Sequence, residues 1–273
     1  MQPPIPFRKG HGTQNDFVLL PDLADALELT ESRVRALCDR RMGLGADGVL
    51  RVVPSEVDAD TWFMDYRNAD GSIAEMCGNG VRVFARYLVD AGLVKRGGFV
   101  IGTRAGDRRV EVHDDDTVTV HMGAVRVFGE SSATVQNMLF PGVAVDVGNP
   151  HLGCQLPEGS TVDVLDLTAQ PGYDRALFPN GVNVEFIQEL GPDAIRMRVH
   201  ERGVGETRSC GTGTVAAVKS WLHSKNRTTG SATVDVPGGQ VSVVITDDGS
   251  TLTGPAEFVA EGTLSSQWWT AHR

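Results

Sequence analysis

Two short segments of the sequence could bind an anion and present a reactive thiol. Both follow the pattern Cys-Gly-x-Gly, as Cys77-Gly78-Asn79-Gly80 and Cys210-Gly211-Thr212-Gly213. Apolar residues at helical spacing follow each segment, so each cysteine should lie at the N-terminus of a helix. The unpaired N–H groups and the dipole there favour a bound carboxylate or phosphate. They also favour the thiolate, so both cysteines should have a lowered pKa.

The two segments belong to an internal repeat. The cysteines are 133 residues apart, close to half of the 273-residue chain. Polar residues precede them at matching distances, nine residues before for Asn68 and Glu201, and 62 and 61 residues before for Asn15 and Asn149. One copy alone would favour a small-residue turn that allows close helix packing. Two copies in register predict a duplicated domain, each half with strands, one long buried helix and a cysteine at its start.

Two thiols that face one carbon atom predict an enzyme that inverts a stereocentre. The reaction needs a base on one face and an acid on the other, and a thiolate with an opposing thiol can exchange these roles. The substrate carboxylate would lie between the helix N-termini, whose N–H groups stabilise the charge that develops as the α-proton leaves. Pyridoxal phosphate often supports the same reaction, but none of the four lysines lies in a recognisable site context.

Composition and charge exclude several classes of protein. Hydrophobic residues form 41% and charged residues 22% of the chain, as in globular proteins. The net charge of −10 argues against a nucleic-acid partner. We see neither a membrane span nor a signal peptide, so a cytoplasmic protein with free thiols is expected. Cys38 and Cys154 lie in apolar segments and should be core residues.

A few helices and several hairpins must position the two cysteines. We expect helices from a Thr30 cap to Arg41, from Gly78 to about Ala91 and from Gly211 to about Ser224. Alternating residues predict hairpins over 110–122 and 233–245, with a further strand after 247–250. Three aspartates, 114–116, favour a solvated turn over a metal site, and Trp268 and Trp269 should anchor the tail.

Taken together, the motifs resemble the diaminopimelate epimerase family. They are Gly12–Phe17, Asn68–Ser72, Met76–Arg82, Gly148–His151, Gly181–Glu185, Glu201–Thr207 and Ser209–Gly213. The resemblance implies an α+β fold of two similar domains, each a curved antiparallel β-sheet or barrel around a central helix, with the site in the cleft between them. It implies an N-terminal domain of residues 1–119 carrying Cys77, on which residues 263–273 pack, and a C-terminal domain of residues 120–262 carrying Cys210.

The resemblance also implies an activity and a set of site residues. It implies a cofactor-independent isomerase, acting as a homodimer, that interconverts LL- and meso-2,6-diaminopimelate for lysine and peptidoglycan precursor synthesis. Cys77 and Cys210 would be the acid/base pair, and His151 and Glu201 would tune the thiols. The residues that would bind the substrate are Asn15, Asn68, Gly78, Asn79, Asn149, Asn183, Glu201, Arg202, Gly211 and Thr212.

The chemistry of the second substrate end agrees with this set. Arg202 can bind a carboxylate through two N–H groups, while Glu201 and the asparagines can accept from an ammonium. Alternatives are a proline racemase-like enzyme, an amino-acid-binding protein that needs no thiols, and a cysteine hydrolase, which needs one nucleophile with a base. One departure from the family is Gly48, where many members carry glutamine, so no role is assigned to Gly48.

Overall fold

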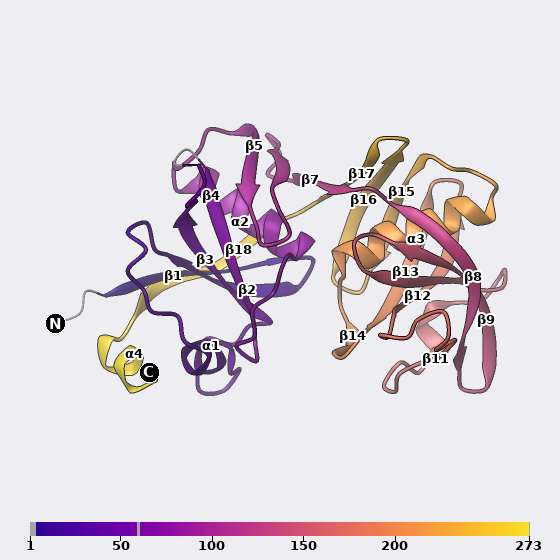
Figure 1. The fold of residues 1–273 in the computed structure, drawn as a ribbon, viewed down its shortest axis with the longest axis horizontal. Coiled ribbons are helices and arrows are strands. Elements are labelled where there is room, and N and C mark those ends of the chain that lie inside the picture. Colours follow the sequence, from indigo (N-terminus) through magenta and orange to yellow (C-terminus); the bar gives the residue numbers. More distant parts are fainter. Residues whose placement is uncertain (1–3, 59–60, 273) are drawn as a thin grey trace. The chain divides into compact units, whose positions relative to one another are not determined.

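The computed structural model describes residues 4–58 and 61–272, and the chain divides into two compact units. Met1–Val120 and Pro255–Arg273 form the N-terminal unit, and His121–Gly254 forms the C-terminal unit. Figure 1 shows that each unit consists of strands around one long helix, α2 in the first and α3 in the second. The α+β fold expected from the sequence is confirmed.

The N-terminal unit begins with a hairpin and ends with the last strand and helix of the chain. Its strands are β1 (Ile5–Gly12), β2 (Asn15–Pro21), β3 (Gly48–Pro54), β4 (Trp62–Asn68), β5 (Gly97–Gly102), β6 (Arg108–Val112), β7 (Val118–Gly123), which crosses the boundary, and β18 (Glu257–Leu264). Its helices are α1 (Glu31–Cys38), α2 (Gly78–Asp90) and α4 (Ser266–Ala271).

The C-terminal unit contains one α-helix. Its strands are β8 (Arg126–Val135), β9 (Met138–Asp146), β10 (Pro150–Gln155), β11 (Gly172–Tyr173), β12 (Asn183–Gly191), β13 (Ala194–Glu201), β14 (Gly205–Thr207), β15 (Gly230–Val236), β16 (Gly239–Thr246) and β17 (Gly249–Gly254). Its helices are α3 (Gly211–Ser224) and the short 3-10 helix η1 (Val162–Val164).

Both units pair their strands in the same order, which confirms the repeat. The N-terminal order is β18-β1-β2-β3-β4-β5-β6-β7, and the C-terminal order is β8-β9-β10-β12-β13-β15-β16-β17. The expected antiparallel sheet is only partly correct, because β2–β3, β4–β5, β10–β12 and β13–β15 are parallel. Parallel neighbours need a long crossover connection, and α2 and α3 lie within two of these connections.

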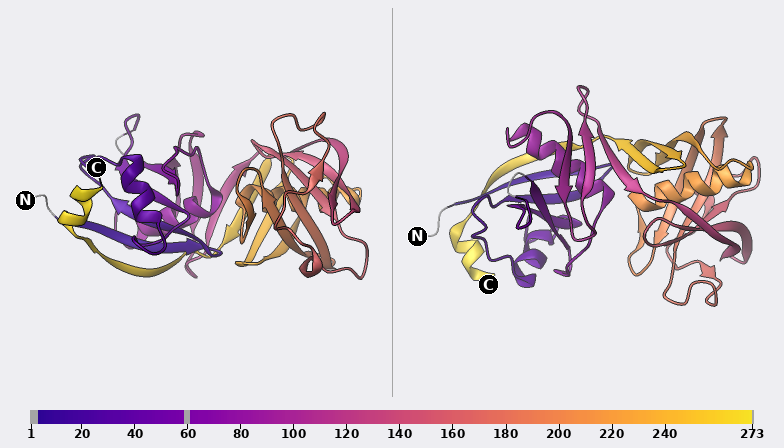
Figure 2. Two further views of the ribbon diagram at one scale, coloured as in Figure 1. Left: turned by 90° about the horizontal axis from the view of Figure 1, so that it is seen from below. Right: turned by 45° about the horizontal axis from the view of Figure 1, so that its top comes forward.

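The last strand belongs to the N-terminal unit, which corrects the expected boundary at residue 262. β18 pairs with β1 from Ile5–Leu264 to His11–Glu257, so residues 255–262 lie with the N-terminal strands. Both views in Figure 2 show this yellow strand beside the indigo β1. β18 therefore occupies in its unit the place that β8 occupies in the other. Trp269 of α4 is fully buried in the same core, with the Arg33 guanidinium 4.6 Å from its ring centroid.

The central helices agree closely with the sequence expectation. α2 and α3 begin at Gly78 and Gly211, and α3 contacts seven strands of its unit: β9, β10, β12, β13, β15, β16 and β17. The helix expected to reach Arg41 ends at Cys38, because Asp39 has an extended backbone. Among the described residues, no helix combines the length and the apolar character needed to cross a membrane.

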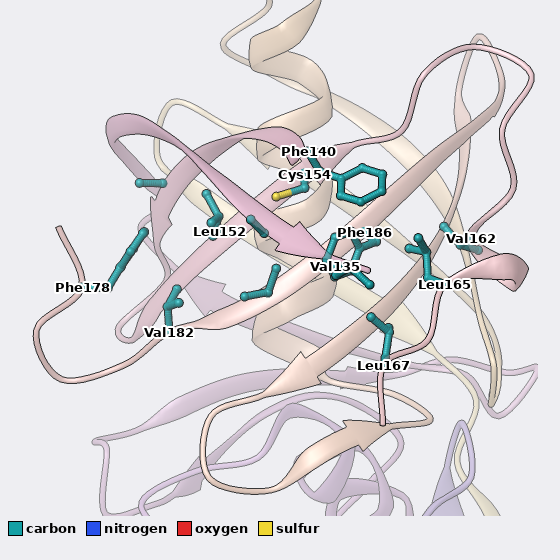
Figure 3. Close-up of a cluster of buried hydrophobic side chains, with 13 residues drawn as sticks. Val135, Phe140, Leu152, Cys154, Val162, Leu165, Leu167, Phe178, Val182 and Phe186 are labelled. Carbon is teal, nitrogen blue, oxygen red and sulfur yellow. The ribbon is translucent and has the colours of Figure 1, made fainter. Parts of the chain in front are cut away.

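An apolar cluster in the C-terminal unit supports the strands that carry the candidate site (Figure 3). Phe140 and Phe186 meet edge to face with their ring centroids 5.4 Å apart, and Cys154 is buried beside them. Burial raises the pKa of the Cys154 thiol to about 12, and burial also raises the pKa of Cys38 to about 12. The expectation that these two cysteines are core residues is confirmed.

Candidate active site

Cys77 lies at the N-terminus of α2, within reach of two asparagines. It is the N-cap residue, with φ −139° and ψ 120°, and it is half-buried. Its Sγ donates to Asn15 Oδ1 at 3.5 Å, and the same oxygen accepts from Asn79 Nδ2 at 3.2 Å. The structure therefore brings three of the predicted site residues together around one amide oxygen.

A charged cluster holds Asn15 in place. Asn15 Nδ2 donates to Asp47 Oδ2 at 2.8 Å, and Arg40 Nη2 lies 2.8 Å from both Asp47 Oδ1 and Asp16 Oδ1. Burial alone would raise the pKa of Asp16, but hydrogen bonds from Arg40 and Lys9 outweigh it and lower that pKa to about 2. Asp16 thus stays ionised and binds Arg40, which in turn holds the Asp47 carboxylate that orients Asn15.

Asn68 and Gly48 face each other at the ends of their strands. Asn68 is the last residue of β4 and pairs in register with Gly48, the first of β3. Its Nδ2 donates to Ser72 Oγ at 3.0 Å. A Cβ at Gly48 would lie 2.6 Å from the carbonyl oxygen of Arg67 and 2.7 Å from Tyr66 Cε2. Any side chain at Gly48 would therefore require the Arg67 backbone or the Tyr66 ring to shift.

The sequence analysis missed a buried arginine on α2. Arg82 is fully buried, its Nη2 donates to Thr13 Oγ1 at 3.0 Å and its Nε donates to the Pro255 carbonyl at 3.2 Å. Burial lowers the pKa of Arg82 to about 10, while the interaction with Cys77 opposes that shift. A cation on the buried face of a helix was a visible signal, because a buried charge requires a reason.

Cys210 occupies the matching position on α3 but has a different environment. Its Sγ accepts from Gly213 N at 3.4 Å and lies 3.6 Å from Thr212 Oγ1. Burial raises the pKa of Cys210 well above its usual range, and the carboxylates of Glu201 and Glu185 raise it further. The expectation of a lowered pKa is therefore wrong for Cys210, because these effects outweigh the N–H groups of the helix start.

Glu201, Asn183 and Arg202 lie close to one another at the strand ends. Glu201 ends β13, and its Oε1 accepts from Thr207 Oγ1 at 2.5 Å. Asn183 Oδ1 accepts from the backbone N–H of Arg202 at 2.9 Å. The exposed Arg202 guanidinium donates from Nη1 to the Asn180 carbonyl at 3.0 Å. In the described part of the chain no carboxylate pairs with this guanidinium, so it can bind one from a ligand.

His151 is part of a buried polar chain that includes a residue missed from the sequence. Its Nδ1 lies 2.7 Å from Glu185 Oε1, and its Nε2 lies 3.0 Å from Asn149 Oδ1. His151 and Glu185 are both fully buried. Burial raises the pKa of Glu185 to about 7, against the opposing effect of His151. The signal in the sequence was an acid at the second position of the otherwise apolar strand segment 184–187.

The predicted residues thus form one cluster in each unit. The N-terminal cluster contains Asn15, Asn68, Cys77, Gly78 and Asn79, and the C-terminal cluster contains Asn149, His151, Asn183, Glu201, Arg202, Cys210, Gly211 and Thr212. Among residues 4–58 and 61–272, no group of three or more His, Cys, Asp or Glu side chains could hold a metal ion. Each cluster combines a thiol, a helix N-terminus and amide groups, which suits an amino-acid ligand.

The sequence matches one known protein family over most of its length. The sequence model of the family described as "Diaminopimelate epimerase" matches residues 7–128 and 143–259. The diaminopimelate epimerase of Rhodococcus jostii (strain RHA1) is 53% identical over 283 residues, covering 96% of this chain and 98% of the relative. That of Mycobacterium ulcerans (strain Agy99) is 54% identical over 288 residues, covering 98% and 99%.

Solved structures share the fold at much lower identity. A phenazine biosynthesis protein of the PhzF family from Bacillus anthracis aligns with a TM-score of 0.74 at 16% identity, covering 97% of this chain and 100% of the other. A hydroxyproline epimerase from Agrobacterium vitis, solved with trans-4-hydroxy-L-proline bound, aligns with a TM-score of 0.68 at 14% identity, covering 96% and 93%. At these identities the likeness concerns the fold alone.

Proposed function

The chain belongs to the diaminopimelate epimerase family, and on that premise we propose that it interconverts LL- and meso-2,6-diaminopimelate with Cys77 and Cys210 as acid and base. It is an isomerase of the kind that serves lysine biosynthesis. The observation that carries the two-cysteine proposal is the repeat itself. Matching strands of the two units lead to matching helices, and a cysteine caps each of them.

The reaction requires both thiols to reach one carbon atom from opposite sides. One cysteine, as thiolate, removes the α-proton, and the electron pair left on carbon is delocalised into the carboxylate. The other cysteine, as thiol, returns a proton to the opposite face, so the configuration inverts and the two sulfurs have exchanged protonation states. The proposal needs no cofactor, because the carboxylate accepts the charge.

The helix starts supply the stabilisation that this charge needs. Gly78 and Asn79 begin α2, and Gly211 and Thr212 begin α3, so their N–H groups lie at helix N-termini, where a bound carboxylate is favoured. Gly78 and Gly211 have no side chain, so a ligand can approach the backbone there. Donors fixed before the reaction stabilise the developing charge at little reorganisation cost.

The unreactive end of the substrate also needs binding groups. We propose that Arg202 binds the second carboxylate and that Asn68, Asn183 and Glu201 contribute to its ammonium group. The exposed guanidinium of Arg202 and the strand-end positions of these residues support this assignment. Asn15 and Asn149 would orient the reacting end, since each contacts a predicted reacting or thiol-tuning residue of its own unit.

The test is exchange of the α-proton in heavy water without an added cofactor. Purified enzyme given LL-2,6-diaminopimelate should form meso-2,6-diaminopimelate that carries deuterium at the α-carbon. Cys77→Ala and Cys210→Ala should each lose epimerisation by about a thousandfold or more while circular dichroism shows an intact fold. Cys38→Ala is the matched control, because its buried thiol lies outside both clusters and should leave turnover unchanged.

Two outcomes would contradict the proposal. Near-normal epimerisation by either active-site variant would show that the reaction does not need two thiols. Racemisation of proline or lysine at rates similar to those for diaminopimelate would show that the second charged end is not recognised.

We further propose that the enzyme is cytoplasmic and that it forms a homodimer. Light scattering would detect the homodimer as a particle of about twice the 29.3 kDa chain mass.

A further inference from the structure

The two units have different side chains beneath their cysteine-bearing helices. In the N-terminal unit, a Cβ at Gly80 would lie 3.3 Å from Leu50 Cδ2 and 3.5 Å from Phe17 Cζ. In the C-terminal unit, a Cβ at the matching Gly213 would lie 2.7 Å from Glu185 Oε1. An apolar contact in one half of the repeat is therefore a contact with a carboxyl group in the other.

Strand register shows that the compared positions correspond. The aligned partners are Phe17 with Gly48 in the parallel pair β2–β3 and His151 with Asn183 in the parallel pair β10–β12. Leu50 follows Gly48 by two residues, and Glu185 follows Asn183 by two residues. The fold thus places a histidine and a glutamate where its other half holds a phenylalanine and a leucine.

Burial of this polar pair is costly for the fold. His151 and Glu185 are fully buried, and Glu185 Oε2 has no hydrogen-bond partner among the described residues. Burying ionisable groups is costly, and well-packed apolar residues of similar volume are often as stable or more stable. The N-terminal unit already contains such an apolar solution, which points to a functional reason for the pair.

We propose that Glu185 is a positioning residue of the epimerase, which holds the His151 ring in one orientation and keeps the Cys210 thiol protonated before the substrate binds. The inference rests on the proposed function, in which Cys210 is one of the two reacting thiols. The 2.7 Å contact joins Glu185 Oε1 to the Nδ1 of His151, so the Nε2 is directed toward Asn149. Cys210 would then be the proton donor when a free enzyme first meets its substrate.

Titratable side chains on three strands face this part of the site. His151 comes from β10, Glu185 from β12 and Glu201 from β13, and all three strands contact α3, where Cys210 is the N-cap. Both carboxylates raise the pKa of the Cys210 thiol in addition to the effect of burial. In the N-terminal unit the fully buried Arg82 attracts a thiolate at Cys77 instead. The two cysteines therefore differ in their electrostatic surroundings although their backbone positions match.

Alkylation of Cys210 tests the proposal without requiring turnover. Iodoacetamide would be applied from pH 8 to 10, where the Glu185 carboxyl group is ionised, and peptide mass spectrometry would follow Cys210 separately from Cys77. Glu185→Gln keeps the size and one acceptor but removes the charge, so its Cys210 should be alkylated as fast as that of the wild type at a pH about one unit lower. Below the Cys210 pKa of both proteins, this corresponds to roughly tenfold faster alkylation at the same pH.

A second glutamate on the same strand provides the matched control. Glu189 is half-exposed and pairs with Lys225 at 2.7 Å, so Glu189→Gln should reproduce the wild-type alkylation curve. A Glu185→Gln curve that overlays the wild-type curve would overturn the proposal. Alkylation also separates the two hypotheses, because failure of the wild type to epimerise diaminopimelate would reject the proposed function without affecting this measurement.

A double variant keeps the proposal testable if Glu185→Gln does not fold. His151→Phe with Glu185→Leu installs the pair found in the N-terminal unit, and it should fold with a melting temperature at or above that of the wild type. Its kcat should fall about a hundredfold or more, whereas KM should change little, because neither side chain is proposed to bind the substrate directly. Epimerisation within threefold of the wild-type rate in a folded double variant would refute the positioning role.

Discussion

Replacing Gly213 by alanine should destabilise the C-terminal unit, whereas the same change at Gly80 should not destabilise the N-terminal unit. Both residues are in the first turn of a cysteine-capped helix. The added methyl group at Gly80 meets the flexible end of Leu50 at 3.3 Å, which can shift slightly. The methyl group at Gly213 meets Glu185 Oε1 at 2.7 Å, and this oxygen is fixed by its contact with His151.

Two opposing energies decide the magnitude. Alanine stabilises a helical position by about 0.5–1 kcal/mol relative to glycine, and this gain applies at both sites. At Gly213 the carboxyl group must move, which weakens a charged buried hydrogen bond worth about 1.5–3 kcal/mol. The net result is a loss of roughly 0.5–2.5 kcal/mol at Gly213, against no change or a small gain at Gly80.

Thermal unfolding followed by circular dichroism measures this difference. A loss of 1 kcal/mol lowers the melting temperature of a domain of 150–250 residues by about 2–4 °C, so Gly213→Ala should melt roughly 1–10 °C below the wild type. Glu185→Leu offers the matched background, because a leucine terminus can move as Leu50 does. In that background Gly213→Ala should be neutral or stabilising, and a double-mutant cycle would show coupling between the two positions.

Equal melting temperatures for Gly213→Ala and Gly80→Ala would refute the reasoning. So would the same loss at Gly213 with or without Glu185, since the carboxyl group would then not be the obstacle. Either result would also weaken the inference about Glu185, because that inference assumes a fixed carboxyl group beside the start of α3.

Three further predictions concern other parts of the molecule. Arg202→Ala should lower kcat/KM for diaminopimelate about a hundredfold, because a substrate carboxylate would lose its charged partner. The melting temperature should stay the same, since the side chain is exposed. An unchanged kcat/KM would contradict the assignment of Arg202 to the second carboxylate. The pKa of Asp16 is lowered to about 2 in the folded protein, against about 4 in the unfolded chain. The ionised carboxylate therefore stabilises the fold above about pH 4, and this stabilisation is lost as the pH falls toward 2. Asp16→Asn should therefore cost roughly 2 kcal/mol in urea unfolding at pH 7 and almost nothing near pH 2, and a pH-independent difference would oppose this account. Trp269→Ala should cost about 3–5 kcal/mol, because the indole is fully buried against Arg33. A melting temperature equal to that of the exposed control Gln267→Ala would show that the tail is not part of the core.

Local signals in the sequence were sufficient to predict the two cysteine-capped helices. Glycines at the helix starts and apolar residues at helical spacing act within a few residues, and α2 and α3 begin where these signals place them. The repeat could also be predicted, because duplicated domains keep equivalent residues at equivalent distances along the chain. Asn68 and Glu201, matched by spacing alone, both end a strand: Asn68 ends β4 directly before α2, and Glu201 ends β13, which only the short β14 separates from α3.

Strand partners and buried charges depended on the tertiary structure. β18 pairs with β1 although about 250 residues separate them, and nothing within the β18 segment specifies which edge it joins. The contact between His151 and Glu185 likewise joins parallel strands 34 residues apart in the chain. The raised pKa of Cys210 follows from that packing: a helix start by itself favours the thiolate, and only the surrounding fold determines how much water is excluded and which carboxylates lie near the sulfur.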